Sequence, residues 1–310
     1  MELSLLLMEQ ILSMAIMILM GFAIVRLGVV RSEDSGVLAA ITLNVISPCV
    51  IINAFQITFS MEKLKGLLLA IGAAILLHVL FILCTHFIGK AAKLNSIERA
   101  SLIYSNGGNL IIPLVSALLG EEAVFYSCAF IAVQNVLLWT HAVSLISAQK
   151  RRNLKKIVTN PNMIAIAVGL TLFLCRTTLP ELLGSTVAKV GGIVGPVCML
   201  VIGMIMGGTN LKRVFWYPHA YLVCLGRLIL YPLLLILVFR ITGMTQLFPE
   251  AHEILLVTLL AASAPVAVTV TNMESLFGSD PVRAGSINVM SVIFCIATMP
   301  LMVAIYQLVC

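Results

Sequence analysis

Long apolar stretches separated by short polar ones run along the whole chain. A helix that spans a membrane needs about 20 consecutive, mostly apolar residues, and ten stretches of this sequence approach or exceed that length. They cover residues 4–27, 36–58, 65–88, 98–119, 122–147, 161–179, 191–208, 218–240, 253–273 and 283–308. The pattern therefore predicts an all-α polytopic membrane protein with ten transmembrane helices.

The longest polar interval, residues 148–160, lies near the middle of the 310-residue chain. It ends in Asn160-Pro161, a capping residue followed by proline at the first helical position. We place the boundary between two halves here, with residues 1–150 as the first five-helix repeat and residues 151–310 as the second. Because five is an odd number, consecutive repeats must insert with opposite topology, which predicts an inverted repeat.

Four prolines agree with such a repeat. Pro48 in the second predicted helix and Pro196 in the seventh are 148 residues apart, and Pro113 in the fourth and Pro265 in the ninth are 152 residues apart. A proline inside a helix frees a backbone carbonyl. Lipid offers no partner for that group, so such breaks survive only where they line a cavity or pack against protein. We expect the broken helices four and nine to cross at the midplane.

The fourth segment carries the most polar break, with Asn106, Gly107, Gly108 and Asn109 ahead of Pro113. The two glycines permit an unwound backbone. The half-helix that begins near Pro113 would direct its N–H groups, which carry a partial positive charge, at the break. A carboxylate could bind there, with Asn106 and Asn109 as further hydrogen-bond donors. The alternative is a kink whose amides bond a neighbouring helix.

Three further side chains complete the predicted substrate-binding set. Thr269 follows Pro265, although its hydroxyl could instead bond a carbonyl that the proline frees. Asn53 in the second helix could contact substrate or another helix. Arg227 lies about nine residues into the eighth helix and is the only basic residue expected deep in the membrane. It could be the counter-charge for an anion or pair with a carbonyl-rich helix end.

Composition and charge exclude several classes of protein. The chain is 61% hydrophobic and 10% charged, whereas soluble domains carry about 25% charged residues. Thirteen of the 19 lysines and arginines fall on the odd-numbered loops, which places those loops in the cytoplasm and both termini outside. The expected location is the cytoplasmic (inner) membrane, with the lipid bilayer as partner. No segment offers the exposed basic face that nucleic-acid binding needs.

Titratable groups and enzyme motifs are scarce in the apolar segments. Apart from Glu9, which lies near the outer face, every Asp and Glu falls in a loop or at a helix end. The chain therefore lacks an obvious intramembrane carboxylate of the kind that holds Na⁺ or H⁺ in cation-coupled carriers. His78, central in the third helix, could titrate near neutral pH or simply pack and hydrogen-bond. The sequence contains no H-E-x-x-H, G-x-S-x-G or phosphate-binding glycine loop, and none of its eight cysteines forms a C-x-x-C pair. We therefore predict no enzyme, no cofactor and no metal site.

Several motifs together resemble the auxin efflux carrier family over essentially the whole chain. They are the stretch 104–114, Asn160-Pro161-Asn162, the run Ala264-Pro265-Val266-Ala267-Val268, and Phe277-Gly278-Ser279-Asp280. The short central loop is similar to that of bacterial members, which are often described as malate or malonate permeases. The match would make Asn106, Pro113 and Pro265 the residues of the family's helix crossing. One departure is His78, because plant exporters carry an acidic residue on the third helix.

The resemblance implies two five-helix inverted repeats, a scaffold and a transport domain, elevator-like alternating access and carboxylate substrates. Our leading interpretation is a secondary transporter, or permease, for small organic anions such as mono- or dicarboxylates. One alternative is a sodium- or proton-coupled symporter of related fold. Another is a transporter-like membrane sensor or scaffold. The chain could also form a homodimer.

Overall fold

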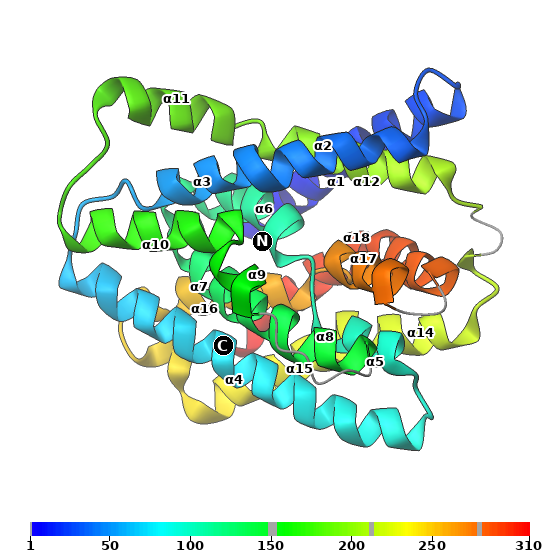
Figure 1. Cartoon of the computed structure of the whole chain (residues 1–310). Helices are drawn as coiled ribbons and strands as arrows, with labels where there is room; N and C mark the ends of the chain where they lie inside the picture. The colour runs from blue at the N-terminus through cyan, green and yellow to red at the C-terminus, as the bar shows by residue number, and fades with distance from the viewer. Residues whose placement is uncertain (1, 148–153, 211–213, 278–280) are drawn as a thin grey trace. The chain divides into compact units, whose positions relative to one another are not determined.

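The computed structural model describes residues 2–147, 154–210, 214–277 and 281–310, and the described residues form helices and no strand (Figure 1). The chain divides into two compact units, and each unit draws on both halves of the sequence. Unit 1 comprises Met1–Leu67, Gly108–Cys128 and Lys155–Asn210. Unit 2 comprises Leu68–Gly107, Ala129–Leu154 and Leu211–Cys310.

Unit 1 contains the first two apolar helices of each sequence half. Its elements are α1 (Glu2–Arg26), η1 (Ser32–Asp34), α2 (Ser35–Ile41), η2 (Thr42–Ile46), α3 (Ser47–Ala54), α6 (Ile112–Leu119), the start of α7 (Glu121–Leu137), most of α9 (Leu154–Val158), α10 (Pro161–Leu174), α11 (Glu181–Gly191) and α12 (Val194–Gly208). The start of α10 follows the sequence prediction, since the Asn160 side chain accepts hydrogen bonds from the Asn162 and Met163 N–H groups at 3.0 and 3.3 Å.

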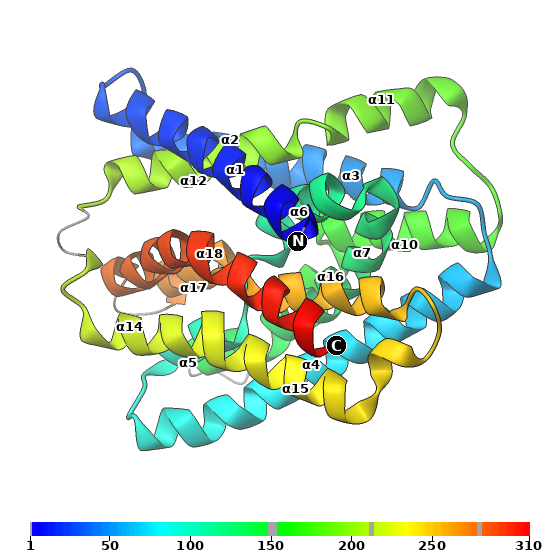
Figure 2. The same ribbon diagram turned by 180° about the vertical axis from the view of Figure 1, so that it is seen from behind.

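Close packing of α1 against α12 holds unit 1 together, and the two helices lie side by side in Figure 2. Glycines make this approach possible. A Cβ atom on Gly203 would overlap the carbonyl oxygen of Ile18, and one on Gly21 would overlap that of Leu200. Gly203 and Gly207 form a G-x-x-x-G pair, the spacing that lets two membrane helices approach at backbone distance.

Unit 2 contains the third, fourth and fifth apolar segments of each half, apart from the parts of the fourth and fifth that belong to unit 1. Its elements are most of α4 (Met61–Ala91), α5 (Ser96–Ile103), the start of η3 (Gly107–Ile111), the rest of α7, η4 (Leu138–Ala142), α8 (Val143–Ile146), α14 (Pro218–Leu225), η5 (Gly226–Leu230), α15 (Tyr231–Thr242), η6 (Met244–Gln246), α16 (Ala251–Ser263), α17 (Val268–Phe277) and α18 (Pro281–Val309).

Helix α16 is the core of unit 2. Every residue from Ile254 to Ser263 is buried, and α16 packs against α15 and α18. A helix that is apolar all round belongs inside a protein rather than on its surface. The ring of Phe81 packs on that of Tyr231 with centroids 4.4 Å apart, and the Tyr231 hydroxyl lies 2.6 Å from the Thr85 hydroxyl.

Three π-helical turns each precede a proline. Pro48, Pro113 and Pro232 occupy the second positions of α3, α6 and α15, directly after η2, η3 and η5. A proline has no N–H to donate and its ring clashes with the carbonyl four residues earlier. A wider π turn removes that clash without ending the helix. The prolines therefore act as local distortions as well as breaks.

Each of the ten predicted segments contains at least one helix. Within the described part of the chain, six stretches are long and apolar enough to cross a membrane: Ser32–Ala54, Met61–Ala91, Glu121–Ile146, Glu181–Gly208, Pro218–Thr242 and Arg283–Val309. Shorter apolar helices cover the first and sixth segments and half of the ninth, and the fourth segment is α5, η3 and α6. The seventh segment begins at Glu181, ten residues before the predicted start. The inverted relation between the halves stays a prediction.

The break in the fourth segment lies earlier than the sequence suggested. Gly107 and Gly108 were predicted to be unwound, but they belong to the π turn η3. The non-helical residues are instead Tyr104, Ser105 and Asn106, and Tyr104 has extended backbone angles (φ −100°, ψ 123°). The second half-helix therefore begins at Gly107 rather than near Pro113, because η3 continues directly into α6.

Replacing Gly203 with alanine should destabilise unit 1, since the new methyl group has no room against α1. Overpacking of this kind costs about 1–3 kcal/mol. The matched control is Gly72→Ala on α4, where a Cβ meets nothing within 4 Å, and this change should be neutral or slightly stabilising. The measurement is the thermal unfolding midpoint of each detergent-purified variant. Equal midpoints for the two variants would contradict the close packing.

Candidate functional site

The two helix breaks of unit 2 pair with each other. Ser105 and Val266 form an isolated antiparallel bridge. The Asn106 N–H donates to the Pro265 carbonyl at 2.8 Å, and the Ala267 N–H donates to the Tyr104 carbonyl at 3.1 Å. We call residues 104–106 and 265–267 the crossing. Each break thus supplies partners for backbone groups that the other leaves without an intrahelical bond.

Side chains from two other helices complete the backbone hydrogen bonds of the crossing. Gln134 of α7 accepts from the Ser105 N–H at 3.0 Å and donates to the Ser105 carbonyl at 2.9 Å, as a neighbouring strand would. On the other side, Asn288 of α18 donates to the Val266 carbonyl at 2.9 Å, and the Ser291 hydroxyl accepts from the Val266 N–H at 3.0 Å. Each extended segment is therefore bonded on both edges: through Ser105 or Val266 on the outer edge, and through the residues on either side of them on the shared edge.

Gln134, Asn288 and Ser291 were not singled out as site residues from the sequence. Gln134 and Asn288 could have been recognised from the sequence, because each is an amide side chain in the middle of an apolar helix. Polar residues in such places usually form hydrogen bonds inside the helix bundle. Gln134 and Asn288 occupy the fifth helix of their respective halves, next to the broken helix. A search for partners of the freed backbone would have singled them out.

Asn106 is a predicted site residue with a buried hydrogen-bond donor that is not used within the described part of the structure. Its side chain is 5% exposed, and its Nδ2 atom has no hydrogen-bond partner among the described residues. Buried polar atoms in proteins are almost always bonded, so an orphaned donor requires an explanation such as a ligand or a water. Gly107 follows, and a Cβ there would lie 2.6 Å from the Phe130 ring. Only glycine fits at this step from the crossing into η3.

Arg227 is completely buried in η5, and its guanidinium contacts backbone carbonyls of both broken helices. It donates to Leu102 and Ile103 at the end of α5, at 3.2 and 3.0 Å, and to Ala264 and Ala261 at the end of α16, at 3.2 and 3.5 Å. The sequence left two roles open for Arg227: a counter-charge for a bound anion, or a partner for the carbonyls at a helix end. The structure shows the second. Direct contact with substrate stays a prediction.

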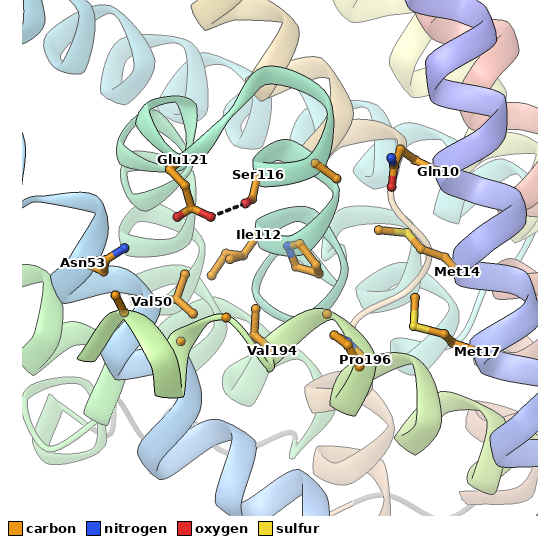
Figure 3. A pocket seen from close by; sticks show the side chains of 16 residues that line it. Gln10, Met14, Met17, Val50, Asn53, Ile112, Ser116, Glu121, Val194 and Pro196 are labelled. Atoms are coloured by element: carbon orange, nitrogen blue, oxygen red, sulfur yellow. Dashed lines mark hydrogen bonds between the residues drawn. The ribbon is translucent and has the colours of Figure 1, made fainter. Parts of the chain in front are cut away.

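Pro113 and Asn53 line a separate feature, a cavity of about 410 Å³ within unit 1 (Figure 3). Asn53 and Glu121 lie on one side, and Gln10, Met14 and Met17 of α1 lie on the other. Gly195 and Pro196 of α12 also contribute. The Ser116 hydroxyl donates to the Glu121 carboxylate at 2.7 Å. None of the residues that line this cavity is a lysine, arginine or histidine.

The other predicted site residues are less informative. Thr269 is partly exposed in the first turn of α17. Gly108 and Asn109 lie in η3, but their side-chain surroundings fall outside the described part of the structure. His78 is buried, its Nδ1 lies 2.7 Å from the Ala74 carbonyl, and its Nε2 has no partner among the described residues.

Two carboxylates are buried in the protein, although neither lies in the middle of an apolar helix. Glu98 and Glu274 of unit 2 are 1% and 5% exposed. Glu98 is at the third position of α5, in a capping box with Asn95, and it also accepts hydrogen bonds from Tyr217 and from His219 at 3.1 Å. A carboxylate can be buried when N–H and hydroxyl donors surround it, as they do here. Among the described residues, no group of three or more His, Cys, Asp or Glu could hold a metal.

The apolar spans, the paired helix breaks and the buried charge that binds their ends define a polytopic membrane protein built like a carrier. A family model of membrane transport proteins matches the chain twice, over residues 6–156 and 147–303. The chain therefore belongs to this family, the auxin efflux carrier family that its motifs resemble. No curated protein matches the sequence.

Loss of the Gln134 side chain should weaken the crossing. In Gln134→Leu, the Ser105 N–H and carbonyl lose their partners, and each unsatisfied buried group costs about 1–3 kcal/mol. Gln134→Glu keeps the acceptor and loses the donor, so we expect an intermediate effect. The thermal unfolding midpoint of the purified variants measures the order. A Leu variant as stable as the wild type would contradict the role of this amide.

Proposed function

We propose that this protein is a secondary transporter, or permease, that moves small organic anions such as mono- or dicarboxylates across the cytoplasmic membrane. Membership of the family supports the transporter class. The observation that carries the anion proposal is the buried Asn106 amide in the crossing, a hydrogen-bond donor with no partner among the described residues. A carboxylate is the acceptor that such a donor binds best.

The electrostatics of unit 2 support an anion over a cation. Arg227 places a buried positive charge against carbonyls one residue before Pro265 and three residues before Asn106. Among the described residues it forms no ion pair with a carboxylate. A positive charge in a poorly screened interior attracts an anion at longer range than it would in water. Arg227 therefore favours an anion at the crossing without needing to touch it.

The proposed mechanism is elevator-like alternating access in a ten-helix inverted repeat. Two matches to one family model, one over each half, support the repeat. Unit 1 takes the first two apolar helices of each half, and unit 2 takes the third to fifth in large part. We propose that unit 2, which carries the crossing, is the moving domain and that unit 1 is the scaffold. In this scheme the odd loops are cytoplasmic and both termini are outside.

A sodium- or proton-coupled symporter is the second candidate, and one observation favours it. Glu98 and Glu274 are buried carboxylates, which are the groups that coupled carriers use. Glu98, however, already accepts hydrogen bonds on both carboxylate oxygens. Uncoupled movement of an anion out of a negative-inside cell is driven by about 2.3 kcal/mol per charge per 100 mV, so that direction needs no coupling ion.

Uptake and release of labelled malate, malonate and indole acetate by proteoliposomes at a clamped potential would identify the substrate class. We expect saturable flux of at least one of these anions. A potential of 100 mV should bias the flux of a monoanion about 50-fold between the two directions, since it adds about 2.3 kcal/mol. Flux of a cation with none of these anions would contradict the proposal.

Asn106→Ala should lower kcat/KM for transport by about 10- to 100-fold, because a hydrogen bond to a charged group contributes about 1.5–3 kcal/mol. Asn106→Asp should lower it further, since a carboxylate would repel the anion. The control is Asn44→Ala, because Asn44 is exposed and bonds only the Ala40 carbonyl within its own helix. Reconstitution yields of all three must match. Unchanged kinetics for Asn106→Ala would make this amide structural.

A further inference from the structure

The carbonyl ends of two half-helices converge on one positive charge in unit 2. Helix α5 ends at Ile103 and helix α16 ends at Ser263. The last carbonyls of a helix have no intrahelical partner, and they carry a partial negative charge of about half an electron. Both helices end at the crossing, where the chain turns to extended backbone. Two partial negative charges are therefore buried close together.

Arg227 supplies the donors for these carbonyls. Its Nη1 atom donates to Leu102 and Ile103, its Nε to Ala264 and its Nη2 to Ala261, at 3.0–3.5 Å. The side chain is 0% exposed. An unpaired buried charge is costly, and within the described residues no carboxylate pairs with this one. The two helix ends and the guanidinium stabilise each other.

The backbone of η5 places the guanidinium at this point. Arg227 follows Gly226, where a Cβ would lie 2.6 Å from the Leu102 side chain. The π turn precedes Pro232 in the same span. The guanidinium carbon also lies 5.7 Å from the centre of the Phe81 ring, whose face attracts cations. The close approach of Gly226 to α5, the π turn before Pro232 and the face of the Phe81 ring together hold the guanidinium in a cation site.

In carriers with discontinuous helices, unwound carbonyls and half-helix C-termini are the groups that coordinate a coupling cation. Here the carbonyl oxygens at the ends of α5 and α16 are hydrogen-bonded to the guanidinium of Arg227, a cation that is part of the chain itself. We propose that the carbonyl ends of α5 and α16 form a monovalent-cation site that Arg227 fills permanently. Given the transport function proposed above, the crossing then keeps its geometry, and anions are transported, without Na⁺ bound at this site.

Removal of the side chain should expose the site to a soluble cation. The Arg227→Ala variant should unfold at a lower temperature than the wild type, and millimolar guanidinium should raise its midpoint saturably, by about 2 °C or more at tenfold excess over the dissociation constant. The same guanidinium should not raise the midpoint of the wild type. The matched control is Arg240→Ala, an exposed arginine on the same span, which should show no such rescue.

Two further variants of Arg227 separate the effect of its charge from the effect of its size. Arg227→Lys keeps a cation with three donors, and Arg227→Met keeps most of the length without charge. The proposal expects Lys to be more stable than Met and to need less guanidinium. A Met variant as stable as the wild type, or an Ala variant with no response to guanidinium, would overturn it. The wild type gives a test without any substitution, since a saturable rise in its midpoint with Na⁺ over choline at equal ionic strength would also overturn it.

Transport measurements separate this inference from the proposed function. Proteoliposomes are loaded with labelled malate, malonate or indole acetate in sodium-free choline buffer, and flux is compared with that in Na⁺ buffer. Equal saturable flux in the two buffers is the expected result. Anion flux that requires Na⁺ would overturn the inference and leave the anion carrier intact. The absence of any anion flux would count against the proposed function, and the unfolding measurements would still decide the role of Arg227.

Discussion

Backbone groups freed by two helix breaks must find partners where neither water nor lipid supplies them, and the architecture of unit 2 depends on this constraint. The two breaks bond some of these groups to each other, through the hydrogen bonds that flank the bridge between Ser105 and Val266. Gln134, Asn288 and Ser291 bond the remaining edges. Arg227 then takes the carbonyls at the ends of both half-helices. Irregular backbone of this kind survives in a membrane protein only when protein groups satisfy it.

Some buried side-chain polar atoms of unit 2 have no partner among the described residues, and one of them lies in the crossing itself. The Asn106 amide is buried beside a fully bonded backbone and has no partner among the described residues. A donor held in place beside a hydrogen-bonded backbone is pre-organised for a ligand, because the cost of ordering it is met during folding. The buried positive charge of Arg227 makes an anion the ligand that this arrangement favours.

Hydrophobic patterning predicted where the helices lie, and proline spacing indicated which two would be broken. Both signals are local, since span length and a missing N–H depend on neighbouring residues alone. The start of the seventh span at Glu181 was missed because residues 181–190 are less apolar than the stretch that follows. The position of the fourth-segment break was misplaced because the π turn η3 absorbs the effect of Pro113, and the chain becomes extended only at Tyr104–Asn106.

The residues predicted to form one site belong to two different units of the structure. Short-range sequence patterns could not have predicted this division. Asn106, Gly107, Pro265 and Arg227 came together in unit 2, whereas Asn53 and Pro113 line a cavity of unit 1. The role of Gln134, and the choice of carbonyls by Arg227, depend on contacts between residues 29 to 125 positions apart. The buried state of Glu98 likewise follows from Tyr217 and His219, which are more than 100 residues away. Such pairings are decided by tertiary packing.

The central claim is that the two breaks pair directly, and a cysteine cross-link tests it most directly. Ser105 and Val266 face each other as a non-hydrogen-bonded antiparallel pair, a geometry with Cα atoms about 4.5 Å apart, within the range that a disulfide spans. Ser105→Cys and Val266→Cys would be combined in a chain whose eight native cysteines are replaced, then oxidised and digested. The account predicts a disulfide-linked peptide pair from the double variant and none from either single variant. Failure of the folded double variant to cross-link would contradict it.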